Sequence, residues 1–115
     1  MIPVIGNIYW ANLPYEENLQ SGRRPVVVTQ NNAGNKYGPR VHVVPLTSNV
    51  KKAYNLPTHV VLEPSDKNGL AKSSVALAED LRPIPKSNLV SWIGKLSKTE
   101  HAQINEAVKR HLGVG

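Results

Sequence analysis

The sequence contains no cysteine and no phenylalanine, and only 5% of its 115 residues are aromatic. The absence of cysteine excludes a disulfide framework and thiolate metal sites, and it suits a reducing cytoplasm. No apolar run approaches the length of about 20 residues that spans a bilayer, and the N-terminus lacks the basic start and long apolar core of a signal peptide. We therefore expect a soluble, cytoplasmic protein without membrane contact, whose fold is held by packing alone.

Acidic residues are also scarce, because 8 Asp and Glu stand against 14 Lys and Arg, which gives a formal net charge of +6. This excess favours an anionic partner, either nucleic acid, an acidic protein segment, or both. A chain of this length can bury one modest core, so residues 1–115 are expected to form a single domain.

Short β-branched runs are separated by turn-forming residues, among them nine prolines and eight glycines. This pattern is typical of short strands joined by turns. It predicts strands over residues 8–13, 26–30, 40–48, 58–63, 73–82 and 89–96, with polar loops at 15–23 and 31–39 and a turn at 83–88.

A helix is predicted at the C-terminus, where Ser97-Lys98-Thr99-Glu100 is a capping-box sequence. Apolar residues recur at helical spacing after it, and Gly113 suits the end of the helix. Strands followed by one helix predict a small, β-rich α+β domain, most economically a partly open barrel.

The segment Gly22-Arg23-Arg24-Pro25 joins a polar loop to a valine run with no spacer. Two guanidinium groups are therefore expected at the start of a strand, where a sheet holds them rigidly. Guanidinium groups offer planar paired donors that match phosphate oxygens. Taken alone, however, such a pair is more often a solvated loop charge.

Five segments, spread over nearly the whole chain, match the MazF/PemK-like toxins in order and spacing. They are residues 6–13, 21–28, 44–49, 57–60 and 77–84. The sequence thus resembles that family, which implies one toxin domain with an SH3-like barrel of five to seven short strands and a C-terminal α-helix. The resemblance also implies a homodimer that acts as a sequence-specific, ribosome-independent endoribonuclease without metal or other cofactor, and a cognate acidic antitoxin whose largely disordered tail folds over the toxin.

The resemblance assigns catalytic roles to Arg24, directly before Pro25, and to Thr47 in the segment Pro45-Leu46-Thr47-Ser48-Asn49. In metal-free RNA cleavage the ribose 2′-hydroxyl attacks the adjacent phosphorus and leaves a 2′,3′-cyclic phosphate and a 5′-hydroxyl. Arg24 is expected to stabilise charge on the phosphate oxygens, and Thr47 to orient the phosphate or the 2′-hydroxyl. The general base stays open, because arginine titrates above about pH 12 and a hydroxyl is a poor base.

Further residues on the flanking loops and in the basic connection 51–57 are expected to contact single-stranded RNA. They are Gln20, Ser21, Arg23, Gln30, Asn31, Asn32, Lys36, Ser48, Asn49, Lys51 and Lys52. Trp10 and Trp92 are predicted to lie in the core or at a dimer contact.

Three positions depart from the commoner family pattern, namely Asn7, Asp80 and Pro83. Because Arg24 and Thr47 are unchanged, these departures bear on the RNA sequence preference and the shape of the groove before they bear on activity. The segment with Glu79, Asp80 and Arg82 is interpreted as an ion-paired strand end in preference to a set of specificity contacts.

Two alternatives stay open. His42 and His59, both in predicted strands, could serve as the base and acid of a two-histidine ribonuclease. The same barrel could also be a non-catalytic module, such as a topoisomerase-poisoning toxin or a degenerate family member that only binds RNA or an antitoxin.

Overall fold

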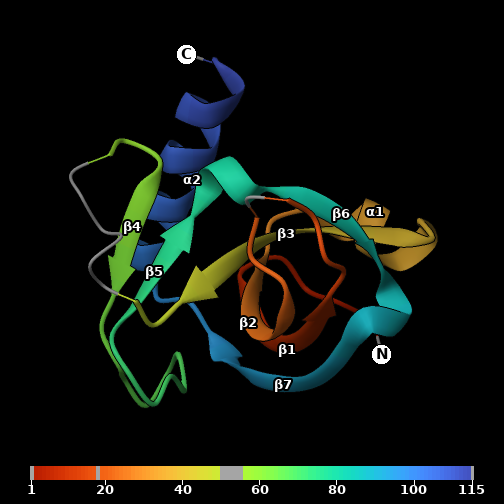
Figure 1. Cartoon of the computed structure of the whole chain (residues 1–115), viewed down its shortest axis with the longest axis horizontal. Helices are drawn as coiled ribbons and strands as arrows, with labels where there is room; N and C mark the ends of the chain where they lie inside the picture. Colours follow the sequence, from red (N-terminus) through yellow and green to blue (C-terminus); the bar gives the residue numbers. More distant parts are fainter. Residues whose placement is uncertain (1, 18, 50–55, 115) are drawn as a thin grey trace.

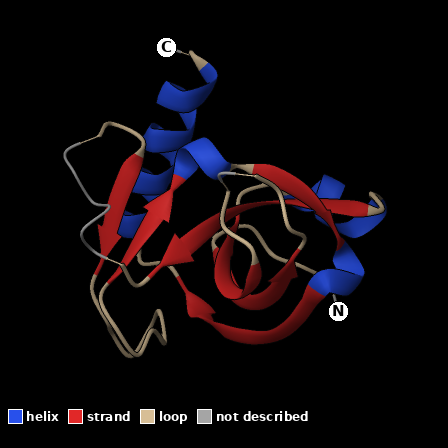
Figure 2. Cartoon of the chain, viewed as in Figure 1, coloured by secondary structure: helices blue, strands red, loops and turns tan. Residues whose placement is uncertain are grey.

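The computed structural model describes residues 2–17, 19–49 and 56–114. Short strands dominate it, and a long helix follows them at the C-terminus (Figures 1 and 2). The strands are β1 (Asn7–Leu13), β2 (Gly22–Val28), β3 (Arg40–Thr47), β4 (His59–Leu62), β5 (Ser74–Leu77), β6 (Arg82–Pro85) and β7 (Leu89–Lys95). The helices are α1 (Asn32–Tyr37) and α2 (Lys98–Leu112), with 3-10 turns η2 (Ala78–Asp80) and η3 (Lys86–Asn88). Within the described ranges, no helix has the length and apolar character needed to cross a bilayer.

The strands form one antiparallel, seven-stranded sheet in the order β4-β5-β3-β2-β1-β7, and β6 pairs with the first half of β3. The sheet curls around itself, with β7 and β6 on opposite sides of the β1–β2 pair (Figure 1). Because β4, β6 and β7 each pair along one side only in the described part of the chain, the barrel is not closed. The predicted β-rich α+β class and the partly open barrel are confirmed.

The valine run of β2 explains how the barrel is packed. Val26, Val27 and Val28 are all fully buried, as expected for a strand that is covered on both faces. Val26 and Val28 join one apolar cluster with Tyr9 and Ile84, whereas Val27 joins a second cluster that includes Ile104 of α2. The strand is therefore fixed between two apolar layers.

Two segments differ from the predicted strand pattern. The predicted strand over 73–82 is broken into β5, η2 and β6, because the chain pairs first with the end of β3 and then with its beginning. The predicted turn at 83–88 is wrong in its first half, where Pro83 and Pro85 belong to β6. Both prolines are exposed, as expected on a strand that pairs along one side only.

The predicted loop over 31–39 contains the short helix α1. Asn31 is its N-cap, and its side chain accepts a hydrogen bond from the Gly34 amide at 2.9 Å. Asparagine favours turns and helix caps alike, which is why the sequence did not separate the two.

The capping box of α2 forms as predicted. The Ser97 hydroxyl accepts from the Glu100 amide at 3.1 Å, and the Glu100 carboxylate accepts from the Ser97 amide at 2.8 Å. Gly113 ends the helix in the left-handed region with φ of +71°, which glycine adopts without strain.

A buried asparagine links this cap to the β4–β5 connection. The Asn68 side chain is fully buried, donates to the Glu63 carbonyl at 2.8 Å and to Glu100 Oε2 at 3.0 Å, and accepts from the amides of Ser65 and Leu70 at 3.0 Å each. One amide group thus fixes both the connection and its contact with α2.

We predict that Asn68→Ala lowers the free energy of unfolding by about 2 to 3 kcal/mol, because it leaves buried backbone groups without partners. The measurement is urea unfolding at one fixed protein concentration. Asn105→Ala is the matched control, since Asn105 is exposed on α2 and should change stability by less than about 0.5 kcal/mol. Equal losses in the two variants would contradict the role given to Asn68.

A second polar contact ties β4 to η2. His59 Nε2 lies 2.6 Å from Glu79 Oε2, with the His59 side chain buried and that of Glu79 37% exposed. Partial burial by itself raises the pKa of Glu79, but hydrogen bonds from His59, the Glu79 backbone and Thr58, together with the charge on His59, outweigh it and bring the pKa below its ordinary value. The pair is a structural contact between two neighbouring elements.

The depressed pKa of Glu79 predicts acid sensitivity of a defined sign. A carboxyl group with a lower pKa in the folded state contributes stability above its unfolded pKa of about 4.3, and this contribution is lost as pH falls through the folded pKa. Glu79→Gln should therefore lose less stability than wild type in thermal melts between about pH 6 and pH 3. Glu106→Gln, at an exposed ion pair with Arg110, should follow the wild-type curve. Parallel curves for wild type and Glu79→Gln would contradict the assignment.

Candidate active site

The site forms where β2 and β3 separate. Their pairing sets Val28 against Val43, Val27 against Val44 and Val26 against Pro45, and then it stops. Pro25 stands directly before Val26 in β2, at the point where the pairing with β3 stops. Neither Pro25 nor Pro45 has an N–H group that could continue the ladder. β3 goes on to pair with β5 through Leu46 and Thr47, while β2 continues against β1.

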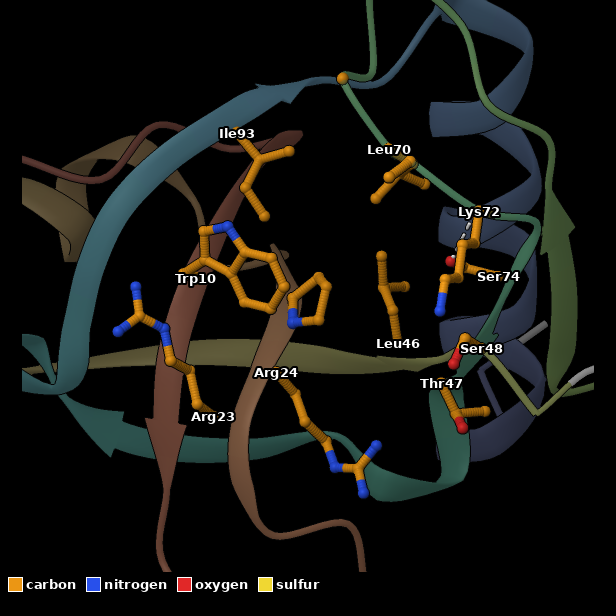
Figure 3. A pocket seen from close by; sticks show the side chains of 13 residues that line it. Trp10, Arg23, Arg24, Leu46, Thr47, Ser48, Leu70, Lys72, Ser74 and Ile93 are labelled. Carbon is orange, nitrogen blue, oxygen red and sulfur yellow. Dashed lines mark hydrogen bonds between the residues drawn. The ribbon is translucent and has the colours of Figure 1, made fainter.

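This divergence opens a pocket of about 340 Å³ (Figure 3). Its walls come from β1, β2, the end of β3, the β4–β5 connection, the start of β5, and β7. The lining residues are Trp10, Arg23, Arg24, Pro25, Leu46, Thr47, Ser48, Gly69, Leu70, Ala71, Lys72, Ser74 and Ile93. Arg23, Arg24 and Lys72 are cationic, and none of the described lining residues is a carboxylate or an imidazole. The pocket is therefore suited to an anion.

Arg24 belongs to β2, which begins at Gly22, earlier than predicted, and pairs Arg24 with Ala11 of β1. The Arg24 side chain is half-buried, and its Nε donates to the Ser21 carbonyl at 2.8 Å. Figure 3 shows its guanidinium turned toward the side of the pocket where Thr47 lies and away from that of Arg23. The local turn thus determines the direction in which this cation points.

Thr47 is the last residue of β3 and is only 5% exposed. Its Oγ1 accepts a hydrogen bond from the Asn49 amide at 3.2 Å, which fixes the oxygen and leaves the hydroxyl proton available as a donor. If the β2–β3 register continued past Val26, it would set Arg24 opposite Thr47. The two predicted catalytic residues therefore line one pocket although they lie far apart in the sequence.

Arg23 lies beside Trp10, with its guanidinium carbon 5.7 Å from the centre of the indole ring. Trp10 is 37% exposed and Trp92 is 59% exposed, so neither tryptophan lies in the core, and a dimer contact stays the prediction for both. Arg23 and Trp10 together present a cation and an aromatic surface at the rim of the pocket.

Only part of the predicted RNA-contacting set lies near the pocket. Arg23 and Ser48 line it, Asn49 contacts Thr47, and Ser21 contacts Arg24. Lys51 and Lys52 fall outside the described residues.

Gln20 precedes β2, where its main chain contacts Asp80 and Arg82, and it does not line the pocket. The other four predicted contacts lie past the opposite end of β2, around α1. Gln30 accepts from the His42 amide, Asn31 caps α1, and Asn32 accepts from the Ile5 amide at 2.9 Å. Lys36 is on α1 and its Nζ lies 5.3 Å from the Tyr37 ring centre. These polar side chains hold local structure and do not line the pocket.

The β4–β5 connection and the start of β5 contribute pocket residues that the sequence did not predict, notably Leu70 and Lys72 in the connection and Ser74 in β5. A lysine in a loop carries no signal of its own in a single sequence. Its position follows from the Asn68 contacts, which hold this connection against the body of the protein.

Neither histidine of the two-histidine alternative lines the pocket. His42 is exposed on β3, and His59 is engaged with Glu79. Across residues 2–17, 19–49 and 56–114, no three His, Asp or Glu side chains lie together as a metal-binding group.

Comparison with known proteins gives consistent results at the level of sequence and structure. A family model for the "PemK-like, MazF-like toxin of type II toxin-antitoxin system" matches residues 5–112. The protein named Endoribonuclease MazF from Staphylococcus saprophyticus is 41% identical over 110 residues, which is 95% of this chain and 90% of that relative.

Solved structures share the fold. MazF from Deinococcus radiodurans superimposes with a TM-score of 0.83 at 27% identity and covers 99% of both chains. An endoribonuclease in complex with its cognate antitoxin from a mycobacterial species gives a TM-score of 0.81 at 27% identity, covering 98% of this chain and 97% of that one. The extent of the family match and the close sequence relative together show that this chain belongs to the PemK-like, MazF-like toxins of type II toxin–antitoxin systems.

Proposed function

We propose that this protein is a sequence-specific, ribosome-independent endoribonuclease that cleaves single-stranded RNA without a metal ion. The observation that carries the proposal is the pocket that Arg24 and Thr47 both line, with Arg23 and Lys72 as its other cationic residues. A phosphodiester is the anion that such a pocket fits. The relatives named Endoribonuclease MazF support the same activity.

In the proposed reaction the ribose 2′-oxygen forms a bond to phosphorus and the bond from phosphorus to the 5′-oxygen breaks. The products are a 2′,3′-cyclic phosphate and a 5′-hydroxyl. Negative charge grows on the non-bridging oxygens in the transition state, and a guanidinium held in place stabilises that charge without reorganisation. Arg24 fills this role.

The Thr47 Oγ1 atom accepts a hydrogen bond from the Asn49 amide, and its hydroxyl proton stays free. In the proposed reaction Thr47 donates this proton in a hydrogen bond to the phosphate. The lining residues include no carboxylate or imidazole among those described. We therefore assign the transfer of the 2′-hydroxyl proton, and of the proton that the 5′-oxygen takes up, to water at the mouth of the pocket.

Arg24→Ala should lower kcat/KM on RNA by about a hundredfold to a thousandfold, the usual effect of removing one preorganised donor. Cleavage is measured on a labelled single-stranded RNA library in the presence of EDTA, with mapping of the cut sites and their ends. Fresh 5′-hydroxyl ends accept phosphate from polynucleotide kinase without prior phosphatase treatment.

Arg23→Ala is the matched control, because Arg23 is the adjacent, exposed cation on the same strand and points elsewhere. It should weaken RNA binding with a much smaller effect on kcat. Full activity of Arg24→Ala would refute the mechanism. Loss of all cleavage by wild type in EDTA would refute metal independence, and binding of RNA without any cleavage would favour the non-catalytic alternative.

We also propose that this protein forms a homodimer, and that a cognate acidic antitoxin neutralises it by occupying the cationic pocket. The net charge of +6 favours an acidic segment, and one structural neighbour was solved with its cognate antitoxin. A peptide of the antitoxin's acidic tail should compete with the RNA substrate, raising the apparent KM while leaving kcat unchanged. RNA binding that persists at saturating antitoxin would contradict competition.

A further inference from the structure

The main chain of Gln20, at the end of the β1–β2 connection, is held on both sides by one short segment of the chain. The Gln20 amide donates to Asp80 Oδ2 at 3.3 Å, and the Gln20 carbonyl accepts from Arg82 Nη2. These contacts fix the two peptide groups that flank the Gln20 Cα atom, so they do not depend on the side chain at position 20.

The next residue in the chain makes the contact that directs Arg24. The Ser21 carbonyl accepts from Arg24 Nε at 2.8 Å. Gly22, between the two, has φ of +79°, which lets the chain turn sharply enough for the arginine to reach back. With Nε engaged at Ser21, the guanidinium meets a phosphate through its two terminal nitrogens. The Ser21 carbonyl that binds Arg24 therefore directly follows the peptide group whose Gln20 carbonyl Arg82 holds.

Asp80 and Arg82 are held firmly by the fold, so they can fix the position of the main chain that they contact. Each is 7% exposed, and Arg82 begins β6 opposite Val43 in the centre of the sheet. Asp80 ends the 3-10 turn η2, which the His59–Glu79 contact ties to β4. Both side chains are thus carried by elements that pack into the sheet.

Stability alone does not account for an arginine at position 82. Its Nε and Nη1 are buried and, within the described ranges, have no hydrogen-bond partner. Burying unpaired donors of a charged group lowers stability, so such a group calls for another explanation. Its remaining terminal nitrogen is the one that holds the Gln20 carbonyl.

We infer that Asp80 and Arg82 are positioning residues for Arg24, which they orient by holding the main chain of Gln20 so that the Ser21 carbonyl can bind Arg24 Nε. This inference rests on the proposed catalytic role of Arg24. For Asp80 and Arg82 it replaces the interpretation as part of an ion-paired strand end. It also gives Asp80, which departs from the family pattern, a partner in the Gln20 amide.

The test combines kinetics with the hydrogen exchange of the Arg24 Nε–H group, followed by NMR in ¹⁵N-labelled protein. Arg82→Met removes the donor and keeps an unbranched side chain. We expect Arg24 Nε–H to exchange with water about tenfold faster or more in this variant. We expect kcat on an RNA oligonucleotide with a mapped cut site to fall by about tenfold to a hundredfold, with a smaller change in KM.

Arg82→Lys, which keeps a cation and a donor, should restore part of both effects. Arg110→Met is the matched control, because Arg110 is exposed on α2, and it should leave both readouts at wild-type values. Wild-type exchange of Arg24 Nε–H in Arg82→Met, or an unchanged kcat, overturns the inference.

Two further measurements keep the inference testable if Arg82→Met does not fold. In wild type, the Gln20 amide should exchange much more slowly than the Glu17 amide of the same connection, and equal rates overturn the inference. Asp80→Asn should speed exchange of the Gln20 amide. A failure of the proposed function can be told apart from a failure of this inference. If only the proposed function is wrong, Arg24→Ala cleaves RNA normally, while Arg82→Met still speeds the exchange of the Arg24 Nε–H group.

Discussion

The antiparallel register that sets Val26 of β2 against Pro45 of β3 is the constraint on which the site depends. Burial of the valine run on both faces leaves β2 little freedom to slip, because a shift by one residue would exchange the two apolar layers. At the two prolines the ladder ends and the strands part. The residues just past that point, Arg24 and Thr47, line the pocket that opens there.

The register explains how a cationic pocket can exist in so small a protein. Arg24 is carried by β2 and Thr47 by β3, and the β4–β5 connection adds Lys72 to the lining of the pocket. That connection is fixed by Asn68, whose contacts reach the cap of α2. The helix thus supports the pocket indirectly, through one buried amide.

Much of the fold could be predicted because its signals are local. The valine run, the capping box from Ser97 to Glu100 and Gly113 each determine structure through neighbours in the sequence, and all three behave as expected. Arg24 and Thr47 were predicted from their motif segments, and the structure places both in one pocket. Whether they perform the chemistry remains a prediction.

The parts that could not be predicted depend on contacts between distant segments. The break at η2 arises because β3 offers two different partners along its length, which no pattern within residues 73–82 encodes. Lys72 reaches the pocket through contacts made by Asn68, and Asp80 and Arg82 hold a main-chain group at Gln20. A bond to a peptide unit places no demand on the partner's side chain, so it leaves no trace in its sequence.

The most direct test of the central claim is a double-mutant cycle on kcat/KM for RNA cleavage with Arg24→Ala, Thr47→Val and the double variant. If the register brings both groups to one phosphate, the two losses will not add. We predict a coupling free energy of at least about 1 kcal/mol, as for residues that share a partner. Losses that add within about 0.3 kcal/mol would show that the two residues act independently and would contradict the account.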